Sequence, residues 1–202
     1  MSMTENGSLP EATAEQPLPI VVSACLLGHE VGYDGSSWPH DVIGRICALP
    51  NVEAHAFCPE NHTLGTPRRW MSIHGGDGHA VLRGDARVVN VDGADLSDPF
   101  RAGAAELLRI AQGAGARIAL LTEISPMCGG TVIYRGEGLP ERVYRAAPGV
   151  GAALLREHGV RVVASRDHAT LGRLLAHLDP GFDPDPNAID YVDDPWFQEH
   201  LV

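Results

Sequence analysis

The chain has 202 residues, of which 44% are apolar, and this is enough for one domain with a sizeable core. Its formal net charge is −11, and binding of bulk nucleic acid requires a positive face, so a large polyanion is not expected as the main partner. No run of about 18 apolar residues occurs, so no transmembrane helix is expected. These properties favour a small or weakly charged substrate over nucleic acid or a membrane.

The N-terminal stretch 1–18 is polar and acidic, and it lacks the basic start and apolar core of a signal peptide. We interpret it as a disordered leader of a cytoplasmic protein. The four cysteines contain no CxxC pair, so neither a disulfide scaffold nor a structural zinc knuckle is expected.

The first half of the chain alternates short apolar runs with turn formers. Residues 19–23 are predicted to form the first strand, and Cys25 follows it. A helix is expected from Trp38 or Pro39 to about Leu49, with Cys47 inside it as a small core residue. Four further elements are predicted, in chain order: a strand at 52–57 that ends at Cys58, a long loop at 61–79, and two short strands at 80–82 and 86–91 that form a hairpin.

The second half continues the alternation around a central strand at 116–122. This strand runs into Glu123-Ile124-Ser125-Pro126-Met127-Cys128-Gly129-Gly130, in which the proline fixes a turn and the paired glycines allow a close backbone approach. The other predicted elements are a helix at 99–112, a short strand at 131–134, an irregular stretch at 135–147, a helix at 150–158, a strand at 160–164 and a helix at 167–178.

This alternation predicts an α/β fold: one Rossmann-like domain, 19–178, with a mainly parallel sheet and a short hairpin at its margin. Residues 179–202 are rich in Asp and Pro and are predicted to be an extended acidic tail. Its aromatic residues are expected to dock on the domain or to contact a neighbouring subunit, so an oligomer is one possibility.

Three cysteines, Cys25, Cys58 and Cys128, each follow a predicted strand. If these strands are parallel neighbours, the thiols meet at the sheet edge where open α/β folds bind ligands. Three thiolates suit a metal group that keeps one position free, and Fe–S clusters are normally held by cysteine. From spacing alone, three unrelated buried cysteines are the favoured interpretation.

Sequence motifs around these cysteines resemble those of the thiouracil desulfidase-like family. The similarity runs from about Ile20 to Val163 in consistent order. The matching segments are Ser23-Ala24-Cys25-Leu26-Leu27-Gly28 with Tyr33-Asp34-Gly35, Cys58-Pro59-Glu60, Thr66-Pro67-Arg68, Ser125-Pro126-Met127-Cys128-Gly129, and Pro148-Gly149-Val150 with Ala153-Leu154-Leu155.

The resemblance implies an enzyme with a 4Fe-4S cluster whose fourth iron is open to substrate. The reaction implied is hydrolytic, non-redox removal of sulfur from a thiolated pyrimidine such as thiouracil. By motif match, the implied site residues are Cys25, Cys58 and Cys128 as cluster ligands, Glu60 and Ser125 as catalytic residues, and Ser23, Tyr33, Ser36 and Arg68 as substrate-binding residues.

The chain also departs from the pattern of this family. Many relatives have Cys-Arg before Tyr-Asp-Gly, where this chain has Val31-Gly32, and a proline is common where Trp70 stands. These changes leave the three cysteines in place but alter the predicted substrate pocket.

Two alternatives stay open on the sequence. One is a non-catalytic iron–sulfur or metal-binding module for sulfur or iron handling. The other is an enzyme with a nucleophilic cysteine, Cys128, and a nearby histidine as base.

Overall fold

A four-stranded parallel sheet forms the centre of the protein. The computed structural model describes residues 12–136 and 143–201. The strand order is β2-β1-β5-β8, and the strands are β1 (Leu18–Ser23), β2 (Val52–Phe57), β5 (Ile118–Leu121) and β8 (Arg161–Ala164). All three pairings are parallel, which confirms the predicted Rossmann-like α/β fold.

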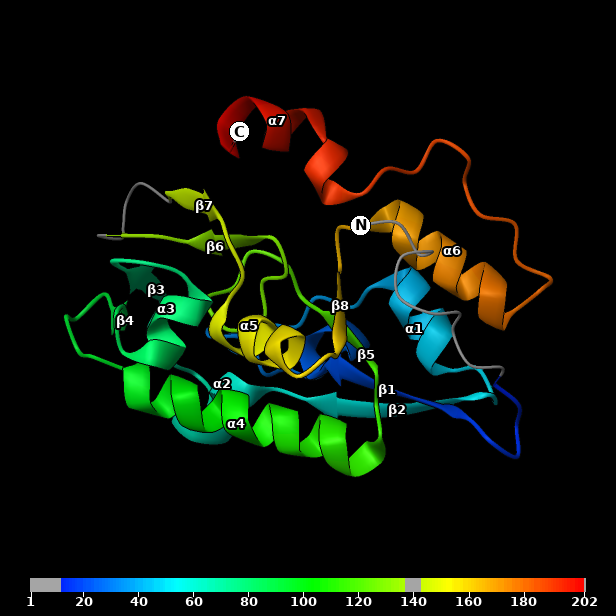
Figure 1. The fold of residues 1–202 in the computed structure, drawn as a ribbon, viewed down its shortest axis with the longest axis horizontal. Helices are drawn as coiled ribbons and strands as arrows, with labels where there is room; N and C mark the ends of the chain where they lie inside the picture. The colour runs from blue at the N-terminus through cyan, green and yellow to red at the C-terminus, as the bar shows by residue number, and fades with distance from the viewer. Residues whose placement is uncertain (1–11, 137–142, 202) are drawn as a thin grey trace.

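Helices cover both faces of this sheet (Figure 1). Alternate residues of β1 and β5 point to opposite faces, as strand geometry requires, and both faces are apolar. One face packs against α1 (Asp41–Cys47) and α6 (His168–Leu178), and the other packs against α4 (Ser97–Ala114) and α5 (Val150–Glu157). The helices α4, α5 and α6 lie close to their predicted positions.

The segment after Cys58 is a helix, so the predicted long loop at 61–79 is wrong. Helix α2 spans Pro59–Leu64, with Cys58 as its N-cap and a proline at its first position. A cap followed by proline is a local start signal for a helix, and it was overlooked in the loop prediction. The strand β3 (Met71–His74) then occupies part of the remaining stretch.

The predicted strand at 80–82 is also a helix. Helix α3 spans Gly78–Arg83, begins where the Asp77 carboxylate accepts the Ala80 N–H at 2.8 Å, and ends at Gly84 in the left-handed conformation. Its apolar residues Ala80 and Val81 are buried in the core.

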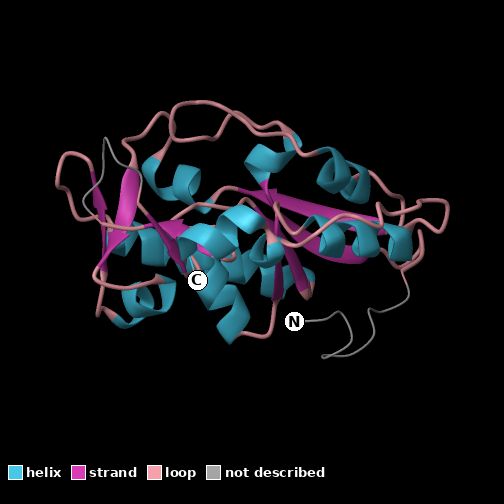
Figure 2. Ribbon diagram, turned by 90° about the horizontal axis from the view of Figure 1, so that it is seen from above, coloured by secondary structure: helices cyan, strands magenta, loops and turns pink. Residues whose placement is uncertain are grey.

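Two small antiparallel pairs stand beside the main sheet (Figure 2). Strand β4 (Arg87–Asn90) pairs with β3, so the hairpin exists but with a different first strand from the one predicted. Strand β6 (Val132–Tyr134) pairs with β7 (Tyr144–Ala146), which lies in the stretch predicted to be irregular. Neither pair joins the main sheet, which is therefore wholly parallel.

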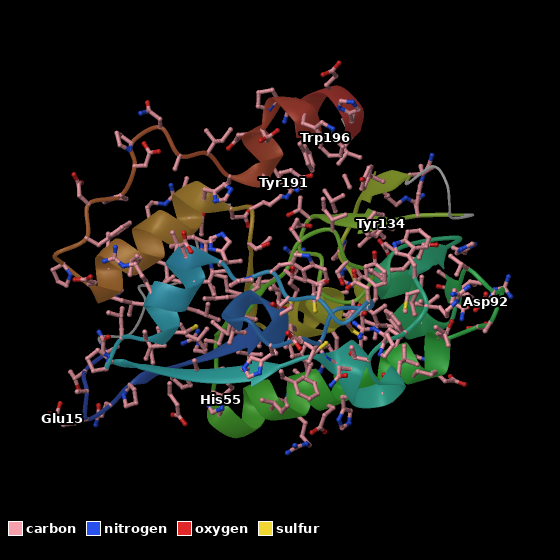
Figure 3. All side chains as sticks on the ribbon, turned by 180° about the vertical axis from the view of Figure 1, so that it is seen from behind. Glu15, His55, Asp92, Tyr134, Tyr191 and Trp196 are labelled. Carbon is pink, nitrogen blue, oxygen red and sulfur yellow. The ribbon has the colours of Figure 1, made fainter. Side chains whose placement is uncertain are left out.

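The C-terminal region returns across the domain to β6 and β7 (Figure 3). Residues 179–190 form no helix or strand, and they lead into a short 3-10 helix, η2 (Tyr191–Asp193), and helix α7 (Pro195–Leu201). Tyr191 and Phe197 are buried in a small apolar cluster with Val132.

Of the predicted leader, residues 1–11 lie outside the described residues, and Leu18 already belongs to β1. Among the helices that the structure describes, none is long and apolar enough to cross a membrane.

Candidate active site

Three neighbouring strands deliver Cys25, Cys58 and Cys128 to one edge of the sheet. Cys25 lies in a short 3-10 helix, η1 (Ala24–Leu27), directly after β1, and Cys58 lies between β2 and α2. Cys128 lies in the turn that follows β5, and this strand pairs with β1 on the side opposite β2. Because the strands are parallel, their carboxyl ends share an edge, and this brings together residues far apart in sequence.

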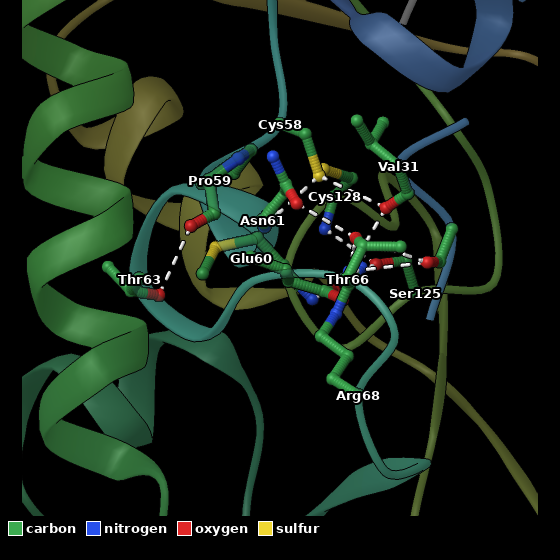
Figure 4. Close-up of polar contacts among 12 residues, drawn as sticks. Val31, Cys58, Pro59, Glu60, Asn61, Thr63, Thr66, Arg68, Ser125 and Cys128 are labelled. Atoms are coloured by element: carbon green, nitrogen blue, oxygen red, sulfur yellow. Dashed lines mark hydrogen bonds and ion pairs between the residues drawn. The ribbon is translucent and has the colours of Figure 1, made fainter. Parts of the chain in front are cut away.

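The three thiols line a single cavity of about 810 Å³. Glu60, Arg68 and Ser125 line the same cavity. Figure 4 shows Cys58 and Cys128 side by side, with Ser125 close to them. The fourth cysteine, Cys47, lies in α1 and does not line this cavity. The geometry therefore separates the three predicted ligands from the remaining thiol.

Burial keeps these thiols protonated when no metal is present. Burial, together with the nearby Cys58, raises the pKa of Cys25 to about 12. Burial also raises the pKa of Cys58, and it raises the pKa of Cys128 well above its usual range, with Glu60 and the other two thiols adding to the effect. The thiols can raise one another's pKa values only if they lie close together. A metal group that binds to them would have to displace their protons.

The donor set fits an iron–sulfur cluster better than a single ion. Within residues 12–136 and 143–201, no three His, Cys, Asp or Glu side chains are grouped tightly enough to hold one metal ion. The cysteines of a cluster bind different iron atoms, so they surround a larger group than one ion. All four cysteines are free thiols, and the three on the cavity provide only sulfur donors, which suit iron in a sulfide-rich cluster.

The turn that carries Cys128 depends on a close backbone approach at Gly129. Its N–H donates to the Ser125 carbonyl at 2.9 Å, and a Cβ at this position would lie 2.3 Å from the Val132 carbonyl oxygen. Any side chain here would push the turn apart, and this is why the predicted glycine pair matters.

Glu60 lies in the first turn of α2, two residues after Cys58, and it is held from two sides. Arg68 donates from Nη2 and Nε to Glu60 Oε2, at 2.6 and 3.0 Å. Ser125 Oγ donates to Glu60 Oε1 at 3.3 Å, while the same hydroxyl accepts the N–H groups of Met127 and Cys128. The two backbone donors occupy the lone pairs of the hydroxyl, so its proton is directed to the carboxylate.

Arg68 joins three loops around this carboxylate. Its Nη1 donates to the carbonyls of Val31, at 3.0 Å, and Gly65, at 3.2 Å, and its own N–H donates to the Tyr33 carbonyl at 2.6 Å. The Arg68 and Glu60 side chains are only 7% and 12% exposed. Arg68 therefore orients Glu60, and its predicted contact with substrate stays a prediction.

Glu123 anchors the other end of the turn that carries Ser125 and Cys128. Its Oε1 accepts the N–H groups of Ile124, Thr131 and Val132, at 3.2, 3.1 and 2.7 Å. Its Oε2 is buried and has no hydrogen-bond partner among the described residues. Burial raises the pKa of Glu123 to about 7, against the opposing effect of the three N–H groups. The sequence analysis assigned no role to this residue.

The remaining predicted substrate-binding residues occupy different places. Ser23 lies at the end of β1 in the cavity wall, where its Oγ accepts the Thr122 N–H at 3.1 Å and hydrogen-bonds to Cys128. Tyr33 is half-buried and lines the cavity. Ser36 does not line it, and its hydroxyl donates to the Asp34 carboxylate. Their contact with substrate stays a prediction.

Another side of the cavity was not predicted from the sequence. It is formed by Trp70, Tyr134, Arg166 and the segment Ile189–Tyr191. We call these residues the outer wall, and we call Cys25, Cys58, Glu60, Ser125 and Cys128 the cysteine wall. The only sequence signal for the outer wall was the presence of aromatic residues in the C-terminal stretch.

Comparisons with known proteins agree with this geometry. Residues 20–167 match the family described as 2-thiouracil desulfurase. The chain is 36% identical over 151 residues to the Uncharacterized protein YbbK of Bacillus subtilis (strain 168), a match that covers 73% of this chain and 96% of that protein. It is similar to the solved structure of the [4Fe-4S]-dependent thiouracil desulfidase TudS, with a TM-score of 0.64 and 36% identity, covering 79% of this chain and 98% of the other. This chain therefore belongs to the 2-thiouracil desulfurase family of enzymes, which act on carbon–sulfur bonds.

Proposed function

We propose that this protein removes the sulfur of 2-thiouracil, or of a closely related thiolated pyrimidine, by hydrolysis. The reaction replaces the C=S bond with C=O: one water molecule is consumed, uracil and hydrogen sulfide are released, and no net electron is gained or lost. The observation that carries this proposal is the meeting of three thiols with a paired carboxylate and a serine in one cavity.

Cys25, Cys58 and Cys128 would hold a 4Fe-4S cluster. When bound, this group would supply one iron atom without a protein ligand, which attracts the soft sulfur of a thiocarbonyl as a Lewis acid. The similarity to the TudS structure, which is described as [4Fe-4S]-dependent, supports the cluster as the cofactor. The four free thiols also favour a reducing compartment such as the cytoplasm.

Glu60 would act as the general base. It accepts a proton from the water that attacks the thiocarbonyl carbon, and it later returns that proton to a ring nitrogen or to the departing sulfur. Arg68 fixes Oε2, so Oε1, which accepts only the 3.3 Å hydrogen bond from Ser125, is the oxygen that can accept a proton from the water. Proton transfer of this kind accelerates a reaction about 10²- to 10⁴-fold.

Ser125 would position the water or the ring. Its hydroxyl lies between Glu60 Oε1 and the backbone N–H of Cys128, which is 3.0 Å away. The Ser125 hydroxyl therefore connects the proposed base, Glu60, to a proposed cluster ligand, Cys128. A small displacement of the turn that carries Ser125 would break this connection.

The direct test is anaerobic reconstitution with iron and sulfide, followed by measurement of iron content and of sulfide released from 2-thiouracil. We expect iron-loaded wild-type protein to release sulfide and uracil in equal amounts. Cys25→Ala, Cys58→Ala and Cys128→Ala should each lose the cluster and the activity, because each removes one of the three protein ligands.

Cys47→Ala is the matched control, because this thiol is half-buried in α1 and lies outside the cavity. It should keep the iron content and turnover of the wild type. A loaded wild-type protein that releases no sulfide would refute the desulfidase proposal and leave a non-catalytic cluster module. Activity without iron that depends on Cys128 alone would instead indicate a cysteine nucleophile.

A further inference from the structure

The C-terminal segment Ile189–Asp194 lies outside the part of the chain that matches the family, yet it reaches the cavity. The family match ends at residue 167, whereas Ile189, Asp190, Tyr191 and Asp194 all line the cavity together with the three cysteines. The match to the TudS structure covers 98% of that chain and 79% of this one. The segment therefore contributes to the cavity from outside the residues that the family model matches.

Buried polar contacts attach this segment to α6 and to the end of β8. The Asp190 carboxylate accepts the Thr170 N–H at 2.7 Å and the Thr170 hydroxyl at 2.6 Å. The Asp167 carboxylate accepts the Tyr191 N–H at 3.3 Å. Because Asp190 accepts both donors of a buried threonine, the segment has a defined position on the domain.

Tyr191 is the aromatic centre of the segment. Its side chain is 2% exposed, and Arg166 Nη1 donates to its hydroxyl at 3.2 Å. The ring of Tyr191 stacks with that of Trp196 at a centroid distance of 6.2 Å, and it meets Phe197 edge-on at 5.6 Å. Figure 3 shows Tyr191 and Trp196 together above the region of Tyr134.

A continuous row of rings connects this centre to another part of the cavity lining. Trp196 contacts Tyr144 at 5.3 Å, Tyr144 contacts Tyr134 at 5.4 Å, and Tyr134 contacts Trp70 at 5.2 Å, all between ring centroids. Trp70, Tyr134 and Tyr191 all line the cavity. The C-terminal segment thus adds Tyr191 to a cavity lining that also contains Trp70 and Tyr134, and the rings of Trp196 and Tyr144 connect Tyr191 to these two residues behind the lining.

We propose that this outer wall binds the planar ring of the thiolated pyrimidine. Trp70, which is half-buried in the cavity lining, contacts the ring. Tyr191, whose own ring stacks with Trp196 and lies under the Arg166 guanidinium, positions the wall. The inference rests on the proposed function and deepens it. Aromatic side chains bind the π-faces of bases, and loss of one such contact weakens binding by roughly ten-fold or more. The outer wall contributes to binding of the ring, whereas holding the cluster and transferring the proton belong to the cysteine wall.

The test compares Tyr191→Leu and Trp70→Leu with the wild type in the reconstituted holoenzyme. Leucine keeps an apolar side chain but removes the ring. For 2-thiouracil we expect KM to rise about ten-fold in each variant, while kcat stays within about two-fold and the iron content is unchanged. Uracil, which lacks the sulfur, should show the same ten-fold loss of affinity by calorimetry, because its ring is retained.

Val192→Ala is the matched control, since Val192 belongs to the same segment, is 41% exposed and does not line the cavity. It should keep the wild-type KM.

Wild-type KM and uracil affinity in both leucine variants, at full iron content, would overturn the inference. If Tyr191→Leu fails to fold, Trp70→Leu decides, because Trp70 is half-buried and lies outside the C-terminal segment. A wild-type protein that releases no sulfide would refute the proposed function, and the uracil measurement would still decide the role of the outer wall.

Discussion

The two walls of the cavity are built in different ways. The cysteine wall comes from the ends of three adjacent parallel strands and is polar, with a buried ion pair and several hydrogen bonds to backbone groups. The outer wall comes from a loop, a small antiparallel pair, Arg166 and the C-terminal segment, and it contains three aromatic residues, Trp70, Tyr134 and Tyr191. The comparison indicates that the groups proposed for the chemistry are fixed by the core of the fold, while the groups proposed to bind the ring are placed by peripheral segments.

The largest effect should come from the carboxylate of the cysteine wall. Glu60→Gln keeps the shape of the side chain but removes the proposed base, so kcat should fall about 10²- to 10⁴-fold while the iron content is retained. Glu53→Gln, in which the original side chain on β2 is 57% exposed, is the control and should keep full activity. A Glu60→Gln enzyme with wild-type kcat would place the chemistry elsewhere.

The next effect should be on stability and would test how rigid the cysteine wall is. Arg68→Met leaves Glu60 buried without its cation, and breaking a buried pair in this way costs about 3–5 kcal/mol of unfolding free energy. Its sequence neighbour Arg69 pairs with Asp92 at the surface, where the two side chains are 64% and 53% exposed, so Arg69→Met should leave the unfolding free energy nearly unchanged. Urea unfolding measures both, and equal losses would contradict the special position of Arg68.

The smallest effect concerns the pH dependence of stability. It involves Glu123, which anchors the turn that carries Ser125 and Cys128. Burial raises the pKa of Glu123 to about 7 from its ordinary value of 4.5, with Asp167 adding to the effect. Between these values the folded state holds a proton that the unfolded state has released. This contribution to stability is therefore complete below about pH 4.5 and is lost as pH rises through about 7.

Glu123→Gln removes this titration and retains an oxygen that can accept the three backbone N–H groups. The wild type should lose unfolding free energy relative to this variant as pH rises from about 4.5 to about 7, by an amount on the order of 3 kcal/mol. Denaturant unfolding at a series of pH values measures the difference between the two proteins. A difference that stays constant with pH would show that Glu123 is ionised throughout.

Local signals were sufficient for the main sheet and for most of the cysteine wall. The apolar runs of β1, β2, β5 and β8 are each bounded by turn formers or cysteines, so the strands and the convergence of their ends were predicted. The motifs at Cys58-Pro59-Glu60 and Ser125-Pro126-Met127-Cys128 supplied candidate site residues that all line the same cavity: Cys58, Glu60, Ser125 and Cys128. The helix start at Cys58 was present in the same motif but was interpreted as a loop.

The periphery could not be predicted in the same way. Ala80-Val81-Leu82 is a short apolar run, and such runs do not distinguish a strand from a helix unless the cap at Asp77 and the stop at Gly84 are taken into account. Strands β3 and β7 are short, with Met71–His74 pairing with β4 and Tyr144–Ala146 with β6. The docking of Tyr191 depends on β6, Arg166 and Asp167, and nothing within the C-terminal stretch specifies these partners.

The order of the two walls along the chain has a consequence for biosynthesis. All three cysteines of the cavity come before residue 130, whereas Tyr191 follows them by a long interval. Because translation proceeds from the N-terminus, the nascent chain carries its thiols before the segment that completes the cavity has been made. During that interval the three thiols lack the cover of this segment and are more accessible to oxidants.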